Sequence, residues 1–134
     1  MKKYLTVLLM IAFITSSAFA VDGSFDAIDK NQDGRISKPE FMDTARKSFD
    51  RVDKNRDGVI TRDELAHMEK RDLERFTREA DANRDGRILK KEYEQAAEKR
   101  FSTFDTNKDD HIDKKEWKIF QSSRNSAGWI LFTF

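Results

Sequence analysis

Oxygen-bearing side chains recur at fixed positions in a twelve-residue stretch, Asp53 to Glu64 (DKNRDGVITRDE). Asp53, Asn55 and Asp57 stand at positions 1, 3 and 5, and Glu64 stands at position 12. A hard divalent cation takes roughly six to eight oxygen ligands, and a tight loop can present them from alternate positions. The final glutamate can close such a site with both carboxylate oxygens. These residue types and their spacing therefore predict a binding site for a hard cation.

Four other positions of the stretch complete this predicted site. Val59 at position 7 offers its backbone carbonyl, and Thr61 at position 9 can bind directly or through a water molecule. Gly58 at position 6 allows the sharp turn that a Cβ would resist. Ile60 at position 8 is expected to pack beneath the loop. This order of residue types resembles the calcium-binding loop of the EF-hand family.

The same pattern occurs four times in the chain. Numbered in chain order, loop 1 is residues 29–40, loop 2 is 53–64, loop 3 is 81–92 and loop 4 is 105–116. Position 8 is isoleucine in every loop. Such an internal repeat is the primary evidence about the fold. The resemblance to the EF-hand family implies an all-α fold of four loops and up to four bound Ca²⁺ ions.

The predicted metal ligands are the oxygens at positions 1, 3, 5, 7, 9 and 12 of each loop, with a backbone carbonyl at position 7. In loops 1 and 2 they belong to Asp29, Asn31, Asp33, Arg35, Ser37, Glu40, Asp53, Asn55, Asp57, Val59, Thr61 and Glu64. In loops 3 and 4 they belong to Asp81, Asn83, Asp85, Arg87, Glu92, Asp105, Asn107, Asp109, His111, Asp113 and Glu116. Loops 1 and 2 carry every expected ligand.

Loops 3 and 4 each depart from the pattern at one position. Leu89 removes the side-chain oxygen at position 9 of loop 3, where water can replace a ligand. Asp110 takes the place of the glycine at position 6 of loop 4. Aspartate tolerates a left-handed backbone better than most residues, at a cost of roughly 1 kcal/mol. We therefore expect four unequal sites.

The distances between the loops are short. Only 12, 16 and 12 residues separate one loop from the next. Twelve helical residues span roughly 18 Å, enough for one helix of about three turns. We therefore expect short helices shared by consecutive loops, in a compact bundle. Loops at opposite ends of one straight helix cannot pair, so loop pairing is expected to be non-sequential.

This layout resembles that of the lanmodulin family, whose members are periplasmic, carry four EF-hands on similarly short helices and select lanthanides. The ligands differ from that family. Lanmodulin loops have proline at position 2, where this chain has Lys30, Lys54, Ala82 and Thr106, and they favour aspartate at position 3, where it has asparagine. Three carboxylates in each of loops 1 to 3 favour a divalent ion, so calcium is the predicted cofactor and a lanthanide the alternative.

Apolar residues at helical spacing predict the helices between the loops. A first helix follows loop 1, and Pro39 suits its first turn. The apolar positions that mark the helices after loops 1 to 4 are, in order, Phe41, Ala45, Phe49 and Val52; Leu65, Met68, Leu73, Phe76 and Ala80; Tyr93, Ala96, Ala97, Phe101 and Phe104; and Trp117, Ile119 and Phe120. All are expected to face a core.

The two ends of the chain differ from the repeats. Residues 1–20 combine Lys2 and Lys3, an apolar run and the cleavage pattern Ala18-Phe19-Ala20, which predicts a signal peptide and a periplasmic or secreted protein. An uncleaved anchor is the alternative. Residues 21–124 form the predicted EF-hand domain. Residues 125–134 are an apolar tail that either packs over the helices, docks on a partner or promotes aggregation.

Composition excludes several classes of protein. Removing residues 1–20 leaves 24 Lys+Arg against 25 Asp+Glu, a formal charge of −1, which gives no electrostatic case for binding nucleic acid or an anionic membrane. The chain has no cysteine, so it has no disulfide and no thiolate metal site. The two histidines, His67 and His111, form no metal-binding pair, and no nucleophile or nucleotide-binding motif occurs. We expect no enzyme activity.

Two kinds of calcium-binding protein fit these residues. The first is a calcium buffer, or a binding module that calcium stabilises. The alternative is a sensor that exposes an apolar surface to a protein partner. Sensors often use methionine-rich grooves. Residues 21–134 contain only Met42 and Met68, which favours the first kind.

Overall fold

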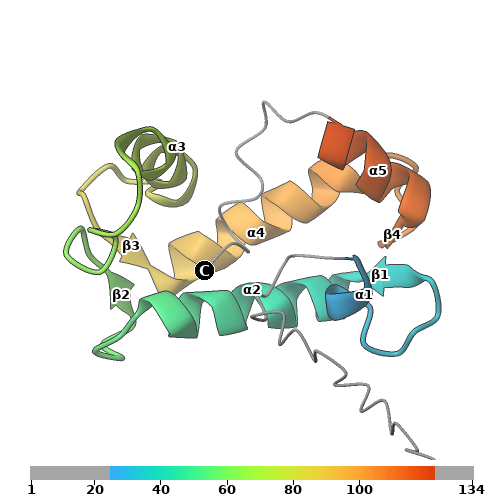
Figure 1. Cartoon of the computed structure of the whole chain (residues 1–134), viewed down its shortest axis with the longest axis horizontal. Coiled ribbons are helices and arrows are strands. Elements are labelled where there is room, and N and C mark those ends of the chain that lie inside the picture. Colours follow the sequence, from blue (N-terminus) through green and yellow to red (C-terminus); the bar gives the residue numbers. More distant parts are fainter. Residues whose placement is uncertain (1–24, 123–134) are drawn as a thin grey trace, which may run out of the picture.

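The computed structural model describes residues 25–122 (Figure 1). The predicted signal peptide and the predicted tail lie outside the described residues. Five helices and four short strands occur in the described part, in the order α1 (Phe25–Ile28), β1 (Arg35–Ser37), α2 (Lys38–Val52), β2 (Val59–Ile60), α3 (Lys70–Ala80), β3 (Ile88–Leu89), α4 (Lys90–Phe104), β4 (His111–Asp113) and α5 (Lys114–Ser122). Among these helices none is long and apolar enough to cross a membrane. The predicted helical class is confirmed, and the short shared helices are confirmed for α2 and α4.

Helices α2 and α4 form the centre of the molecule. They make the most extensive contact between any two elements, and they lie side by side along the long axis in Figure 1. Strand β1 precedes α2 and pairs with β4, which follows α4, while β2 follows α2 and pairs with β3, which precedes α4. The two helices therefore run antiparallel, with one pair of loops at each end.

Each loop pair is joined by a short antiparallel two-stranded sheet. The position-8 isoleucines lie opposite each other, Ile36 against Ile112 in one sheet and Ile60 against Ile88 in the other. All four are buried. Loop 1 thus pairs with loop 4 and loop 2 with loop 3. The predicted non-sequential pairing is confirmed for loops 1 and 4 and is wrong for loops 2 and 3, which are consecutive in the chain.

The segment between loops 2 and 3 differs from the prediction. We expected a helix marked from Leu65 to Ala80, but α3 begins only at Lys70, and residues 62–67 form turns. The Leu65 N–H donates to the Arg62 carbonyl at 3.2 Å, and the Met68 N–H donates to the Leu65 carbonyl at 2.9 Å. The break has a geometric cause: loops 2 and 3 pair directly, so their connection must turn back instead of running straight.

The core is built largely from aromatic side chains of α2 and α4. Phe41 of α2 meets Phe101 of α4 edge to face, with ring centres 5.5 Å apart, at the end near loops 1 and 4. At the other end Phe49 meets Tyr93 at 5.4 Å, and Phe76 of α3 meets the same tyrosine at 6.1 Å. Such edge-to-face pairs add stability beyond the burial of area. They fix α2 against α4 at both ends.

One predicted core position is wrong. The side chain of Ile119 is 61 % exposed, whereas Trp117 is buried. Residues two apart on a helix point to different faces, so these two side chains cannot share one stripe. Met68 and Leu73 are partly buried against the core, as their apolar character predicts.

Tyr93 supplies a test of how the helices are joined. Its ring is buried, its hydroxyl is hydrogen-bonded to the Ser48 side chain of α2, and burial raises the pKa of that hydroxyl. We expect Tyr93→Phe to lower the free energy of unfolding by about 1–3 kcal/mol, because it leaves the buried Ser48 hydroxyl without this partner. Urea unfolding followed by circular dichroism measures the change. Tyr93→Phe combined with Ser48→Ala should cost less than the sum of the single changes, and strict additivity would contradict the bond.

Candidate metal centres in four loops

Position 1 of every loop is the end of the helical segment before it. In loop 2 the Asp53 N–H donates to the Phe49 carbonyl at 2.9 Å, and equivalent 2.9 Å bonds end the helices before the other loops. The four position-1 side chains are only 4–6 % exposed; they are Asp29, Asp53, Asp81 and Asp105. A helix C-terminus carries partial negative charge, so a buried carboxylate there is electrostatically costly. A cation in the loop would relieve that cost.

The position-1 carboxylate also shapes the loop. In loop 2 one oxygen of Asp53 accepts the Asp57 N–H at 3.1 Å, and the other accepts the Gly58 N–H at 2.8 Å. The same two bonds recur in loops 1, 3 and 4, at 2.9 to 3.2 Å. One side chain therefore holds the backbone of each loop in a tight turn.

Positions 3 and 5 are brought together in every loop. In loop 2 the Asn55 side-chain amide donates to the Asp57 carboxylate at 2.9 Å, and the other Asp57 oxygen accepts the Val59 N–H at 2.9 Å. Loops 1, 3 and 4 repeat both bonds. The second bond fixes the backbone at position 7, whose residues are Arg35, Val59, Arg87 and His111. That their carbonyls bind metal stays a prediction.

Two positions of each loop have a left-handed backbone. At position 6 the glycines have φ of 81–84°, and Asp110 adopts the same region with φ 62°. A Cβ at Gly34, Gly58 or Gly86 would meet nothing within 4 Å, so the backbone angle alone disfavours a side chain there. Position 4 is also left-handed, with φ of 58–61° at Gln32, Arg56, Arg84 and Lys108. The left-handed backbone at position 4 could not be predicted from the sequence, because those residue types do not indicate a left-handed turn.

The position-12 glutamate connects the two ends of its loop. In loop 1 one oxygen of Glu40 accepts the Lys30 N–H at 3.0 Å, and the other accepts the Ser37 N–H at 2.9 Å. Burial acts to raise the pKa of Glu40, but hydrogen bonds from Ser37, Asn31 and Lys30 outweigh it and lower that pKa. Glu64, Glu92 and Glu116 also accept the backbone N–H of position 2 or 3 and the backbone N–H of position 9 of their own loops.

Position 9 has a different role in each loop. Ser37 is the N-cap of α2 in a reciprocal capping box with Glu40, and its hydroxyl donates to Glu40 at 2.7 Å. Thr61 donates to its glutamate at 3.2 Å. Asp113 accepts the Glu116 N–H at 2.8 Å, and this hydrogen bond lowers the pKa of Asp113. Leu89 has no such group, is 42 % exposed and leaves α4 without a side-chain N-cap.

The loop residues fit a hard cation through their oxygens. Within residues 25–122, no three histidine, cysteine, aspartate or glutamate side chains are already arranged to hold a metal ion. The loop carboxylates accept backbone N–H groups of their own loop. An ionised carboxylate has about four lone-pair sites, so these oxygens keep capacity for an ion. Binding would draw the oxygens of positions 1, 3, 5 and 12 toward one point.

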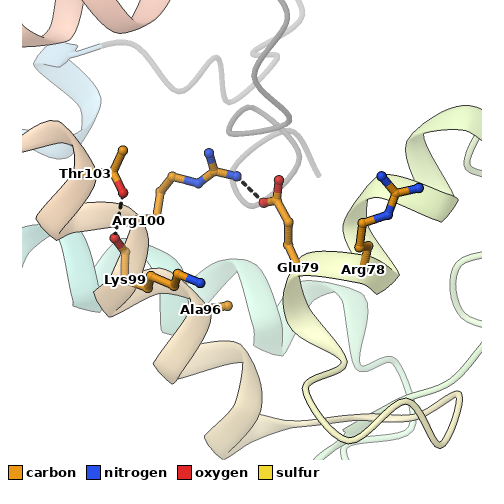
Figure 2. Close-up of a pocket in the computed structure, with 6 residues that line it drawn as sticks. All are labelled: Arg78, Glu79, Ala96, Lys99, Arg100 and Thr103. Carbon is orange, nitrogen blue, oxygen red and sulfur yellow. Dashed lines mark hydrogen bonds and ion pairs between the residues drawn. The ribbon is translucent and has the colours of Figure 1, made fainter.

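A hollow away from the loops is lined mainly by positively charged side chains, whereas the loops carry carboxylates. It lies between α3 and α4, has a volume of about 280 Å³ and is lined by Arg78, Glu79, Ala96, Lys99, Arg100 and Thr103 (Figure 2). The Arg100 guanidinium is paired with the Glu79 carboxylate. Three cationic side chains against one carboxylate make the hollow unsuitable for a metal cation. The loops are therefore the cation sites that the geometry favours.

Comparison with known proteins agrees with the repeat. A family model described as EF hand matches residues 21–43, 46–68, 78–96 and 98–121. Each of these segments contains one complete loop. A comparison with curated proteins found no match.

Leu89 of loop 3 is a position where a side-chain oxygen could be restored. The φ and ψ of Leu89 are −70° and 148°, close to the −72° and 157° of the N-cap Ser37. Leu89→Ser is expected to stabilise the protein by about 1 kcal/mol through the new N-cap, and to strengthen ion binding in loop 3. Urea unfolding and cation titration measure the two effects. Leu89→Ala is the matched control, and a serine variant no better than the alanine variant would refute the prediction.

Asp110 of loop 4 is a position where backbone strain could be removed. Asp110→Gly keeps the backbone N–H that donates to Asp105 at 3.0 Å and removes the side chain from a left-handed position. We expect a gain of up to about 1 kcal/mol in the free energy of unfolding. Asp110→Asn removes the charge but keeps a side chain, and so separates charge from backbone strain. Equal gains from glycine and asparagine would show that charge, and not φ, limits this loop.

Proposed function

Because the chain belongs to the EF-hand family, whose domains bind calcium, we propose that it is a secreted or periplasmic calcium-binding protein. In this proposal it acts as a calcium buffer or as a module that calcium stabilises. The observation that carries the proposal is the common geometry of the four loops. In each loop a buried aspartate ends the preceding helix at position 1, and a glutamate stands at position 12. Both side chains accept backbone N–H groups of the loop and so hold it in the same turn.

Calcium stabilisation is supported by the electrostatics of the position-1 aspartates. Four nearly buried carboxylates at helix C-termini carry an electrostatic cost, which their backbone N–H bonds reduce and a bound cation would reduce further. An ion that binds only the folded chain adds its binding free energy to stability. The chain is also rich in charge, with 38 % Asp, Glu, Lys and Arg.

Export is supported only by the sequence. Lys2 and Lys3, the apolar run and the Ala18-Phe19-Ala20 pattern have the form of a cleaved signal peptide. Outside the cytoplasm calcium is abundant, and modules there typically bind with Kd of about 10⁻⁴–10⁻³ M. The arginines at position 7 of loops 1 and 3 place positive charge near the ion and agree with such modest affinity.

Calcium is favoured over a lanthanide by the ligand set. Loops 1, 2 and 3 supply three carboxylates each, and position 3 is an amide that donates to position 5. A trivalent ion gains more from added negative charge than a divalent one. Loop 4, with Asp113 as a fourth carboxylate, is the loop best suited to a higher charge.

The buffer or stabilised module is favoured over a sensor by the distribution of apolar groups. Met42 and Met68 pack against the core. In the part that the structure describes, the large hydrophobic side chains that are exposed are Leu89 and Ile119, on different elements. We accordingly propose a binding role without catalysis, since the loop carboxylates are engaged in holding the turns.

Titration of residues 21–134 with Ca²⁺ tests this function. We expect two to four ions and a rise in melting temperature with calcium, and Glu64→Gln should weaken loop 2 by roughly tenfold or more, because it removes the bidentate ligand. Asp63→Asn makes the same change of charge at an exposed residue outside the ligand positions and should change affinity little. Isothermal calorimetry and circular dichroism give both quantities.

Three outcomes decide between the candidates. No heat and no stabilisation by Ca²⁺ would refute the proposed function. If La³⁺ bound many orders of magnitude more tightly than Ca²⁺ and the chain folded on binding it, the lanthanide alternative would be favoured. A large calcium-dependent rise in binding of an apolar dye would favour the sensor.

A further inference from the structure

We infer that the four loops bind their ions as a single coupled set, with α2 and α4 carrying the coupling between the two loop pairs. This inference rests on the proposed calcium-binding function. Direct pairing of loops through a shared sheet couples loop 1 with loop 4 and loop 2 with loop 3. Beyond this direct pairing, the two pairs, at opposite ends of the molecule, also influence each other.

The chain forms a closed circuit of loops and helices. Loop 1 leads through α2 into loop 2, which pairs with loop 3, which leads through α4 into loop 4, which pairs with loop 1 (Figure 1). Each of the two central helices is 15 residues long, roughly 22 Å. Neither contains a glycine, and the proline of α2 is in its first turn, where it does not kink the helix. Both helices are therefore continuous rods between two metal loops.

Each rod is attached to a metal ligand at both ends. Glu40, the last ligand of loop 1, is in the first turn of α2, and Asp53, the first ligand of loop 2, is its C-cap. Glu92 and Asp105 have the same places at the two ends of α4. Each glutamate carboxylate already accepts N–H groups of its loop, and bidentate binding would draw it further toward the ion. The first turn of the helix must follow, and a rigid helix passes that movement to its other end.

The residue after each glutamate transmits the movement to the core. Phe41, Leu65, Tyr93 and Trp117 follow the four glutamates, and all are buried. Phe41 contacts Phe101 and Phe104, which lie in the last turn of α4 before loop 4. Tyr93 contacts Phe49, which precedes loop 2, and Phe76, which precedes loop 3. Close-packed interiors transmit small displacements instead of absorbing them.

Calcium titration of a variant that lacks one site tests the coupling. The amides of Gly34, Gly58 and Gly86 donate to the first aspartate of loops 1, 2 and 3, so their ¹H–¹⁵N signals report each loop separately. With Glu40→Gln, which disables loop 1, we expect the calcium midpoints at Gly58 and Gly86 to rise by at least about fivefold. Glu74→Gln, an exposed change in α3, is the matched control.

A second pair of variants separates coupling from loss of stability. Lys47 and Gln95 are exposed residues near the middle of α2 and α4. Glycine at both positions makes the two helices more flexible. Alanine removes the same side chains and keeps the helices rigid. The rise in the calcium midpoints of Gly58 and Gly86 that Glu40→Gln causes should persist in the double-alanine variant. It should fall below about twofold in the double-glycine variant. Because each rise is a ratio within one background, general destabilisation cancels.

The outcomes are distinguishable. Absence of any calcium-dependent shift in the unmodified protein would contradict the proposed function. Normal calcium binding with unchanged Gly58 and Gly86 midpoints in Glu40→Gln would overturn only the coupling between pairs. An equal rise in the alanine and glycine backgrounds would show that the helices do not carry it.

Discussion

The hydrogen bonds of the position-12 glutamate join three parts of the structure that are usually described separately. Glu40 accepts N–H groups from both ends of loop 1, and it also forms the capping box at the start of α2. The next residue, Phe41, is fully buried against α4. Loop shape, helix initiation and core packing therefore depend on one carboxylate. The same arrangement of a glutamate followed by a buried residue occurs at Leu65, Tyr93 and Trp117.

The number of residues between the loops determines which loops can pair. Twelve residues permit only one straight helix, and α2, which is 15 residues long because it begins inside loop 1, spans roughly 22 Å. Loops 1 and 2 are therefore kept apart, as are loops 3 and 4. The four additional residues between loops 2 and 3 allow a series of turns before α3, so these two loops meet. Their meeting brings α2 and α4 together and leaves loops 1 and 4 side by side at the other end.

Charge and burial are in conflict in this chain, and the conflict is concentrated in the loops. The position-1 aspartates are among its most buried polar side chains, and each lies at the negative end of a helix. The surface of the α2–α4 pair carries exposed ion pairs, such as Arg46 with Glu94 and Lys90 with Asp50, which contribute little each. A folded state of this kind depends on its small aromatic core and on the compensation of the loop charges.

Much of the site could be predicted because its chemistry is local. The alternation of Asp, Asn, Asp and Glu within twelve residues places those side chains around one turn, and the hydrogen bonds of Asp53, Asn55 and Asp57 hold that turn together. That these side chains bind a metal ion stays a prediction. The position-8 isoleucines could likewise be predicted to be buried. The left-handed backbone at Arg56 and its equivalents could not, because it follows from the hydrogen bonds of the neighbouring aspartates and not from the residue itself.

The sequence alone determined the four loops, the places of their oxygen-bearing side chains, their differences at Leu89 and Asp110, and the helices α2 and α4 between them. The tertiary structure decided that loop 1 meets loop 4, that the segment after Glu64 turns before α3 begins, and that Ile119 points away from the buried Trp117. The reason is physical. Spacing fixes what residues within one turn can do together, whereas pairing depends on where complete helices carry the loops in space.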